Sequence, residues 1–419
     1  MWSSFNFSHC SSLINTYLFR VILFSILFLS STLSAQEVKK DSISIGERIT
    51  INSKLLNESR TLLISTPDNF DKSKPYHVIY LFDAEYLFTS TVGIVTSLIN
   101  ARKIPPSIIV GIESTNRARD FIPPIEGEPQ NNHQSWIKKK FPQFGGTENF
   151  TAFLQSELFP FVEKNYPVKP NRTMIGYSNS GVFGLHTLVS SPSTFTNYLL
   201  ISPAAWWGEN EIDEKLTYFS ESHESYSGNL FLTVAGEGRG MYSNSLRIAA
   251  QLEAKAPQSL HWVFKQFENE THQSTIYPSI YQGLTNLFED INFKISDELG
   301  KYASVSDIEN YYAQLSKRYE YDITIPEIVF SDLADAQFLH HKNSLAIDTL
   351  KQWVSTYPAS SFAYTSLARG YMFTEKFTLA KLNFENAIKI VTKKEIKDPS
   401  VMDYLKDSVE EAQNKINHE

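Results

Sequence analysis

The first feature with chemical potential is a serine in a short turn flanked by glycines. Residues 176–181 read GYSNSG, and Ser178 lies near the centre of this turn. A short apolar run at 173–175 precedes the turn, and residues 182–189 after it have the composition of a helix. A strand, a sharp turn with a central Ser and a helix form the context in which a G-x-S-x-G-like motif marks a nucleophile. We therefore predict that Ser178 attacks a carbonyl carbon.

The backbone around this serine predicts an oxyanion hole. The turn directs the N–H of Asn179 to the space above Ser178, beside the positive end of the following helix. In this architecture a second N–H comes from a loop after an earlier strand, which places Ala84 or Glu85 near the reacting carbonyl. Ser180 stands where the motif has its second Gly, but Gly follows directly, so we expect the turn to form.

A serine nucleophile needs a base within hydrogen-bond reach, and His272 best meets this requirement. In this architecture the order along the chain is Ser, acid, His. His272 lies in a polar loop at 268–274, after the last strand-like run and before a helical segment at 276–288. The other histidines weighed lie on the helix after the serine, at a strand start or in the C-terminal helical region; they are His186, His261, His340 and His341.

The acid that orients the base has three candidates. Glu237 follows a strand-like run, and flanking glycines permit a turn that aims its carboxylate at Nδ1 of His272. The alternative role for Glu237 is a surface turn paired with Arg239. Glu270 is closer to His272 in sequence, but residues two apart in a loop need not face each other. The third arrangement is a Ser–His dyad oriented by a backbone carbonyl. We favour Glu237.

Four further residues are candidates for the substrate pocket. Asp83 ends a strand-like run, and we expect it to fix the oxyanion loop by accepting hydrogen bonds from backbone N–H groups. Trp206 and Trp207 form either an apolar wall of the pocket or a cap on the core. Arg119 either holds an anionic substrate or forms an internal salt bridge that pins its loop. No metal-ligand spacing, dinucleotide fingerprint or phosphate loop occurs in the sequence, so we predict neither a metal nor a cofactor.

The elements that must position these residues alternate between strands and helices. The strand-like runs are 44–52, 60–65, 77–82, 107–112, 173–175, 197–202, 230–235 and 261–267. Continuous apolar runs suit parallel strands buried on both faces, and the alternation predicts an α/β sheet with right-handed crossovers. Ligands bind at the carboxyl ends of such strands, and Asp83, Ser178 and Glu237 all follow predicted strand ends.

After about residue 296 the pattern becomes helical alone, and two segments repeat at an offset of 34 residues. Phe330, Leu333, Ala334, Ala346 and Leu350 recur as Tyr364, Leu367, Ala368, Ala380 and Phe384. This period is typical of tetratricopeptide helical pairs, and residues 400–416 suit a capping helix. The helical tail either binds a protein partner in a groove or packs against the preceding domain, and the sequence leaves both open.

Composition and the N-terminus set the class of protein. The 419 residues allow two domains, and 42% hydrophobic residues indicate a packed globular chain. A formal net charge of -8 argues against nucleic-acid binding. An apolar run at 21–29 follows Arg20, and small residues lead to Ala35, as in a signal peptide cleaved there. That run is too short for a bilayer-spanning helix. The alternative is an uncleaved N-terminal anchor.

Three segments follow from these patterns. Residues 1–35 are the predicted signal peptide, 36–295 the α/β domain and 296–419 the helical tail. Since the only cysteine, Cys10, precedes the apolar run, the mature chain has no disulfide or thiol chemistry. We expect an exported protein, periplasmic or secreted, without a stable membrane span after cleavage.

Several short segments of the sequence together resemble the esterase D-like family of α/β-hydrolases over roughly residues 44–292. The matching segments are 80–83, 109–112, 116–120, 123, 145–146, 150–166, 176–181, 201–203, 206–207, 232–234, 237 and 272. The resemblance implies an α/β-hydrolase fold and carboxylic-ester cleavage or acyl transfer through an acyl-enzyme. Members of that family include siderophore, feruloyl and acetyl esterases.

We therefore expect an exported serine esterase that acts on a small-molecule or glycan-linked ester, such as a siderophore or cell-wall ester. An acyltransferase would use the same residues. A different class of function, a non-catalytic binding or assembly module that uses the hydrolase fold as a scaffold, is the main rival.

Overall fold

The computed structural model describes residues 42–418 except 69, 126, 130–131, 206–208, 224–225, 227, 239, 292, 320–321 and 394–398. The predicted signal peptide, Trp206, Trp207 and Arg239 lie outside the described residues. The range Ile45–Glu419 forms one compact unit. No described helix is both long and apolar enough to cross a membrane.

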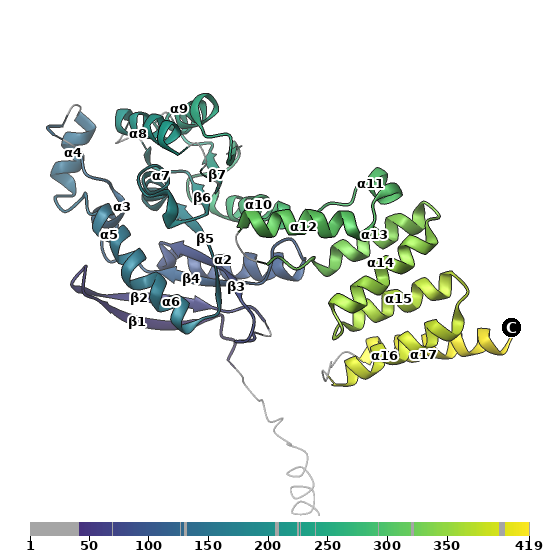
Figure 1. Cartoon of the computed structure of the whole chain (residues 1–419). Coiled ribbons are helices and arrows are strands. Elements are labelled where there is room, and N and C mark those ends of the chain that lie inside the picture. The colour runs from purple at the N-terminus through teal and green to yellow at the C-terminus, as the bar shows by residue number, and fades with distance from the viewer. Residues whose placement is uncertain are drawn as a thin grey trace, which may run out of the picture. The chain divides into compact units, whose positions relative to one another are not determined.

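An eight-stranded sheet forms the centre of the first part of the chain (Figure 1). Its strands are β1 (Glu47–Ser53), β2 (Glu58–Ser65), β3 (Tyr76–Phe82), β4 (Ser107–Ile112), β5 (Val168–Tyr177), β6 (Asn197–Ile201), β7 (Gly228–Ala235) and β8 (Leu260–Phe267). The spatial order is β1-β2-β4-β3-β5-β6-β7-β8. β2 is antiparallel to both of its neighbours, and β4, β3, β5, β6, β7 and β8 run parallel. The predicted α/β-hydrolase sheet is thus confirmed.

The burial of each strand follows from its place in the sheet. Every residue of β3, β4 and β6 is buried, as expected for central parallel strands covered on both faces. The edge strand β8 instead alternates between exposed and partly buried residues. Continuous apolar runs therefore identified the central strands, whereas β8 has the weaker alternating pattern of an edge.

Helices cover both faces of the sheet. One face packs against α2 (Ala84–Asn100) and α10 (Ile276–Leu287). The other face packs against a continuous helical segment, α5 (Thr147–Phe153), the π-helical turn Leu154–Leu158 and α6 (Phe159–Asn165), and against α7 (Asn179–Ser190), α8 (Glu209–Ser222) and α9 (Gly240–Lys255). Short helices α3 (Arg117–Phe121) and α4 (Asn132–Lys140) lie in the long connection after β4, and 3₁₀ turns occupy Pro192–Thr194 and Glu289–Ile291.

The C-terminal region is all helical, as predicted. Its helices are α11 (Asp297–Tyr302), α12 (Val305–Tyr319), α13 (Glu327–Leu339), α14 (Asn343–Thr356), α15 (Ser361–Phe373), α16 (Phe377–Lys393) and α17 (Pro399–Asn417). α13 and α15 begin 34 residues apart, and so do α14 and α16. Nine of the ten repeated residues are buried, and Tyr364 is partly buried against the same core. The 34-residue period therefore describes two real helical pairs.

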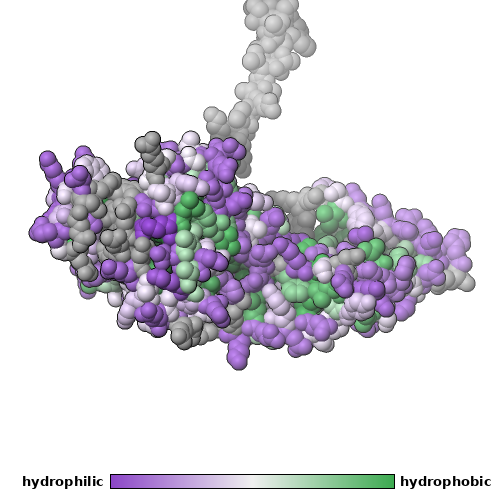
Figure 2. Space-filling view, turned by 90° about the horizontal axis from the view of Figure 1, so that it is seen from above, coloured by the Kyte–Doolittle hydropathy of each residue, from purple (hydrophilic) through white to green (hydrophobic). Residues whose placement is uncertain are grey.

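The helical region is joined to the α/β domain at the 3₁₀ turn after α10. Two adjacent tyrosines of α12 donate hydrogen bonds to backbone carbonyls there, Tyr311 to Asp290 at 2.9 Å and Tyr312 to Ile291 at 2.6 Å. The hydrophobic cluster on the α2 and α10 face continues without a break into the tail as far as Ala412. Hydrophilic residues cover most of the face seen in Figure 2, and apolar residues gather there in separate patches.

Candidate active site

The turn that holds the predicted nucleophile, called the nucleophile turn below, joins β5 to α7, and Ser178 is its strained residue. Ser178 has φ 57° and ψ −110°, a conformation that L-residues rarely adopt and that costs about 1–3 kcal/mol. Three backbone hydrogen bonds hold it: its N–H donates to the carbonyl of Ile201 at 2.9 Å, and its carbonyl accepts from Val182 and Ala204 at 3.1 Å each. The surrounding strands and helix therefore impose this conformation on Ser178.

Close backbone approach requires a glycine at position 176 and leaves little space beside Gly181. A Cβ at Gly176 would lie 2.5 Å from the carbonyl oxygen of Ser180, which is too close for any side chain. A Cβ at Gly181 would lie 3.2 Å from Cα of Pro203. Position 180, between these two glycines, accommodates a serine, so the turn forms despite the departure from the motif, as expected.

Ser180 has a fully buried side chain with defined partners. Its Oγ accepts a hydrogen bond from the N–H of Tyr177 at 2.7 Å and donates to Oδ2 of Asp83 at 2.8 Å. The carbonyl of Tyr177 lies 3.0 Å from the same Oγ. One hydroxyl thus links the nucleophile turn to the loop after β3.

Asp83 follows β3 directly and has a left-handed conformation, with φ 56°. The prediction that its carboxylate bonds backbone N–H groups is wrong, because it makes no capping hydrogen bond to α2. Its oxygens instead accept from Nε and Nη2 of Arg117 at 2.6 and 3.0 Å and from the hydroxyls of Ser114 and Ser180. The side chain is 1% exposed, so Asp83 is an internal anchor of the loop.

Ala84 and Glu85 form the first turn of α2, where backbone N–H groups lack partners within the helix. Ala84 is buried and Glu85 is exposed. The Glu85 carboxylate accepts from the N–H of Ser114 at 3.0 Å. Although the residue as a whole is exposed, loss of water around its carboxyl group raises the pKa of Glu85, and the backbone N–H groups of Glu85 itself and of Ser114 act in the opposite direction.

The predicted base and acid are brought together. Nδ1 of His272 lies 2.7 Å from Oε2 of Glu237. Their two loops are joined, since the N–H of Gly236 donates to the carbonyl of Glu270 at 3.0 Å. A Cβ at Gly236 would lie 2.1 Å from the carbonyl oxygen of Glu268, so glycine is needed for this approach. Glu270 thus contributes its backbone to the pairing of the loops.

The carboxylate of Glu237 is held in its ionised form. Burial alone would raise its pKa, but His272, Ser202 and the N–H of Ala235 beside the carboxylate outweigh this and lower the pKa from its ordinary value of 4.5. The Ala235 N–H lies 3.3 Å from Oε1.

The imidazole of His272 also lies against Tyr177, the residue that precedes Ser178. Its ring centroid is 4.7 Å from that of Tyr177, with 35° between the planes. Burial raises the pKa of Tyr177 to about 12, and the negative charge of Glu237 adds to this effect. The phenol of Tyr177 is therefore neutral, and its ring lies against the imidazole of His272 at the carboxyl end of β5.

Arg119 lies in an internal ion-pair network. Its Nη2 and Nε are each 2.7 Å from a carboxylate oxygen, of Glu58 and Asp120 respectively. Arg60, which sequence reasoning missed, is fully buried between the same two acids.

Among the other histidines, His186 is buried beside Thr147, and burial lowers its pKa to about 4.

Arg117, Ser114, Tyr177 and Ser202 were not predicted as parts of the site. Arg117 and Arg119 are neighbours in one short helix, and only the fold decides that Arg117 faces Asp83. Ser202 follows β6 directly, with φ 41°, and its Oγ accepts from the N–H of Ala235 at 3.2 Å. Its place after a strand, like that of Asp83 and Ser178, was the available signal.

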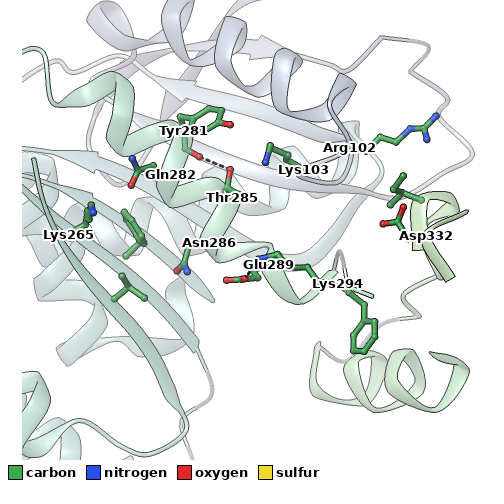
Figure 3. Close-up of a pocket in the computed structure, with 14 residues that line it drawn as sticks. Arg102, Lys103, Lys265, Tyr281, Gln282, Thr285, Asn286, Glu289, Lys294 and Asp332 are labelled. Atoms are coloured by element: carbon green, nitrogen blue, oxygen red, sulfur yellow. Dashed lines mark hydrogen bonds and ion pairs between the residues drawn. The ribbon is translucent and has the colours of Figure 1, made fainter. Parts of the chain in front are cut away.

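A hollow of about 480 Å³ is lined by other residues (Figure 3). It is lined by the second half of α10 and the segment that follows it, by the loop after α2, and by β7, β8 and α13. Four cations and two carboxylates face it, and Lys294 pairs with Glu289 at 2.6 Å. None of the predicted site residues lines it. Across the described ranges, no group of three or more His, Cys, Asp or Glu residues is placed to hold a metal ion.

Comparison with known proteins gives a consistent family. The chain is 29% identical to the ferri-bacillibactin esterase BesA of Bacillus subtilis over 239 residues, covering 52% of this chain and 82% of that protein. An IroE-like serine hydrolase from Shewanella oneidensis matches with a TM-score of 0.59 and 25% identity, over 73% of this chain and 98% of that one. An uncharacterised protein from Capnocytophaga ochracea shares the fold over 88% of this chain and 99% of that one, with a TM-score of 0.60 and 16% identity.

The family described as "Putative esterase" matches residues 53–277, a range that contains every residue of the nucleophile turn, the acid loop and the histidine loop. The chain belongs to this esterase family and is a carboxylic ester hydrolase.

Proposed function

We propose that this protein is an exported serine esterase in which Ser178, His272 and Glu237 form the catalytic triad. The observation that carries the proposal is the 2.7 Å contact between His272 and Glu237, made beside the strained turn of Ser178. The ring contact between His272 and Tyr177 supports it, since Tyr177 directly precedes Ser178 in the chain.

In the first half-reaction, Oγ of Ser178 attacks the ester carbonyl while Nε2 of His272 takes the hydroxyl proton. Ionised Glu237 stabilises the imidazolium that forms and keeps Nδ1 protonated. Collapse of the tetrahedral intermediate breaks the ester C–O bond. The departing alcohol takes the proton from Nε2, and the acyl group stays on Oγ.

In the second half-reaction, a water molecule attacks the acyl-enzyme with His272 again as the base. The carboxylic acid leaves and Ser178 regains its proton. The N–H of Asn179 and an N–H of the Ala84–Glu85 turn would stabilise the oxyanion in both steps, since both belong to first helical turns at the carboxyl end of the sheet.

The substrate proposal is an ester outside the cytoplasm, such as a siderophore or cell-wall ester. A relative that acts on ferri-bacillibactin supports the siderophore class, and the apolar run at 21–29 supports export with cleavage after Ala35. We also propose that 36–295 is the catalytic domain and 296–419 a packing extension. The comparisons do not support a protein partner for this tail.

Labelling with a fluorophosphonate probe tests the triad. The wild type should be labelled, Ser178→Ala should not, and Ser279→Ala, which removes a different buried serine hydroxyl, should be labelled normally. A panel of esters then identifies the acyl group. If the folded wild type is not labelled, or if Ser178→Ala keeps full ester cleavage, the mechanism is wrong and the scaffold function is favoured.

A further inference from the structure

We propose that Ser180 is a positioning residue for ester cleavage. Its hydroxyl joins the nucleophile turn to the oxyanion loop and so sets the distance between Ser178 and the N–H groups of α2. The inference rests on the proposed function and deepens it, because Ser180 itself touches neither the substrate nor the reacting atoms.

The turn side of this link is the backbone of Tyr177. The Ser180 Oγ accepts from the Tyr177 N–H at 2.7 Å, and the Tyr177 carbonyl is 3.0 Å away. Both groups belong to the peptide units that flank Tyr177, directly before Ser178. The hydroxyl is fully buried, so water does not replace it without rearrangement.

The loop side of the link is Asp83, the residue directly before Ala84. The Ser180 hydroxyl donates to Oδ2 at 2.8 Å across 97 residues of sequence. Arg117 donates hydrogen bonds to both oxygens of the same carboxylate, and Ser114 donates to Oδ1. Together with Ser180, three side chains therefore hold the carboxylate in place. Because Asp83 is buried and left-handed at the start of α2, a shift of its carboxylate would move the first turn of that helix.

A glycine at position 180 would remove both connections. The Tyr177 N–H and one oxygen of Asp83 would each lose a buried partner, and the two halves of the oxyanion hole would no longer be tied by a side chain. A displacement of about 1 Å in a catalytic constellation lowers the rate about 10²-fold. The serine at this position therefore performs a task that glycine does not.

The experiment compares Ser180→Ala with the matched control Ser279→Ala. Ser279 is also fully buried, and its Oγ lies 2.9 Å from the hydroxyl of Thr233 on β7. Both substitutions delete one buried helical hydroxyl with two or more partners, but only Ser180 connects the turn to the loop. Their unfolding midpoints in urea should fall by similar amounts.

The kinetic readout separates positioning from stability. For Ser180→Ala we expect kcat on a soluble ester to fall about 10- to 100-fold, while KM changes less than about threefold. The affinity for a boronic acid that mimics the tetrahedral intermediate should fall in parallel with kcat/KM. Ser279→Ala should keep kcat and boronate affinity within about twofold of the wild type.

Ser180→Gly removes the hydroxyl without leaving a methyl group, and it should show the same fall in kcat. It serves as the test if the alanine variant does not fold. The inference is overturned if a folded Ser180 variant keeps kcat within twofold, or if Ser279→Ala loses as much. Failure of the proposed function would look different, because the wild type and Ser178→Ala would then cleave esters equally.

Discussion

The edge of the sheet that holds the proposed catalytic residues and the helical pairs of the tail both contain residues with positive φ, but these residues serve different ends. At the edge, Asp83, Ser178 and Ser202 have positive φ, and each follows a strand directly. In the tail, His341 and Glu375 have φ 57° and stand 34 residues apart, just after α13 and α15. In the tail the conformation is a local way to end a helix. At the edge it is held by bonds between distant segments, and it brings side chains to one place.

The two regions therefore differ in what a substitution changes. Residues at the catalytic edge should affect turnover more than folding. Residues in the helical pairs should affect folding alone. The following substitutions test that division, from the largest expected effect to the smallest.

Removal of the base should have the largest effect. His272→Ala should lower kcat about 10⁴-fold or more, because the serine then has no group to take its proton. Glu237→Gln should lower kcat less if a backbone group can orient the imidazole in its place. Steady-state kinetics with an activated ester checks both. Comparable kcat for His272→Ala and wild type would contradict the assignment of the base.

Loss of a core side chain in the tail should act on stability. Trp353 is fully buried, and its Nε1 donates to Glu327 at 2.9 Å. Trp353→Ala should lower the free energy of unfolding by about 3–5 kcal/mol. Urea denaturation measures this change. Below the unfolding transition kcat should stay unchanged, and a parallel fall in kcat would show that the tail supports the active site.

A buried histidine near the start of β3 should make the stability of the fold sensitive to acid. His77 lies buried there, 3.3 Å from Nζ of Lys169. Burial, with a further contribution from Lys169, lowers the pKa of His77 well below 6.5. As the pH falls below 6.5, the unfolded chain binds a proton that the folded chain does not. Stability should then decline by up to about 1.4 kcal/mol per pH unit.

His77→Gln should flatten this dependence, whereas His261→Gln, on exposed β8, should not. Urea unfolding between pH 5 and 7 measures it, and an unchanged slope in His77→Gln would contradict the explanation.

Because the pKa of Glu237 is lowered below 4.5, its ionisation should not produce an acid limb of kcat/KM above about pH 5.

The smallest effect concerns the helix ends of the tail. Glu375 is exposed and left-handed, so Glu375→Gly should raise the free energy of unfolding by about 1 kcal/mol. Glu385→Gly, inside α16, should lower it by about the same amount. Thermal unfolding of both variants checks the opposite signs. A destabilised Glu375→Gly would mean that its side chain matters more than its backbone.

The sequence predicted the sheet well because central strands are continuous apolar runs and helices follow a clear period. It also predicted that His272 and Glu237 meet, since chain order and strand ends are local features. It did not predict Arg117, because Arg117 and Arg119 are equivalent until α3 is placed beside Asp83. It misassigned the partners of Asp83 for the same reason. Ser180, 97 residues from Asp83, gave no signal of its bond.

The joint after α10 has a consequence for how such proteins diverge. The hydroxyls of Tyr311 and Tyr312 donate hydrogen bonds to carbonyl oxygens of the main chain, which every amino acid supplies. The hydroxyls therefore place no demand on which side chains occupy the turn. The apolar contacts at the joint do place such a demand, because Ile291 is buried in the hydrophobic cluster that continues into the tail, so a chain that acquires such a tail must also present a matching apolar surface.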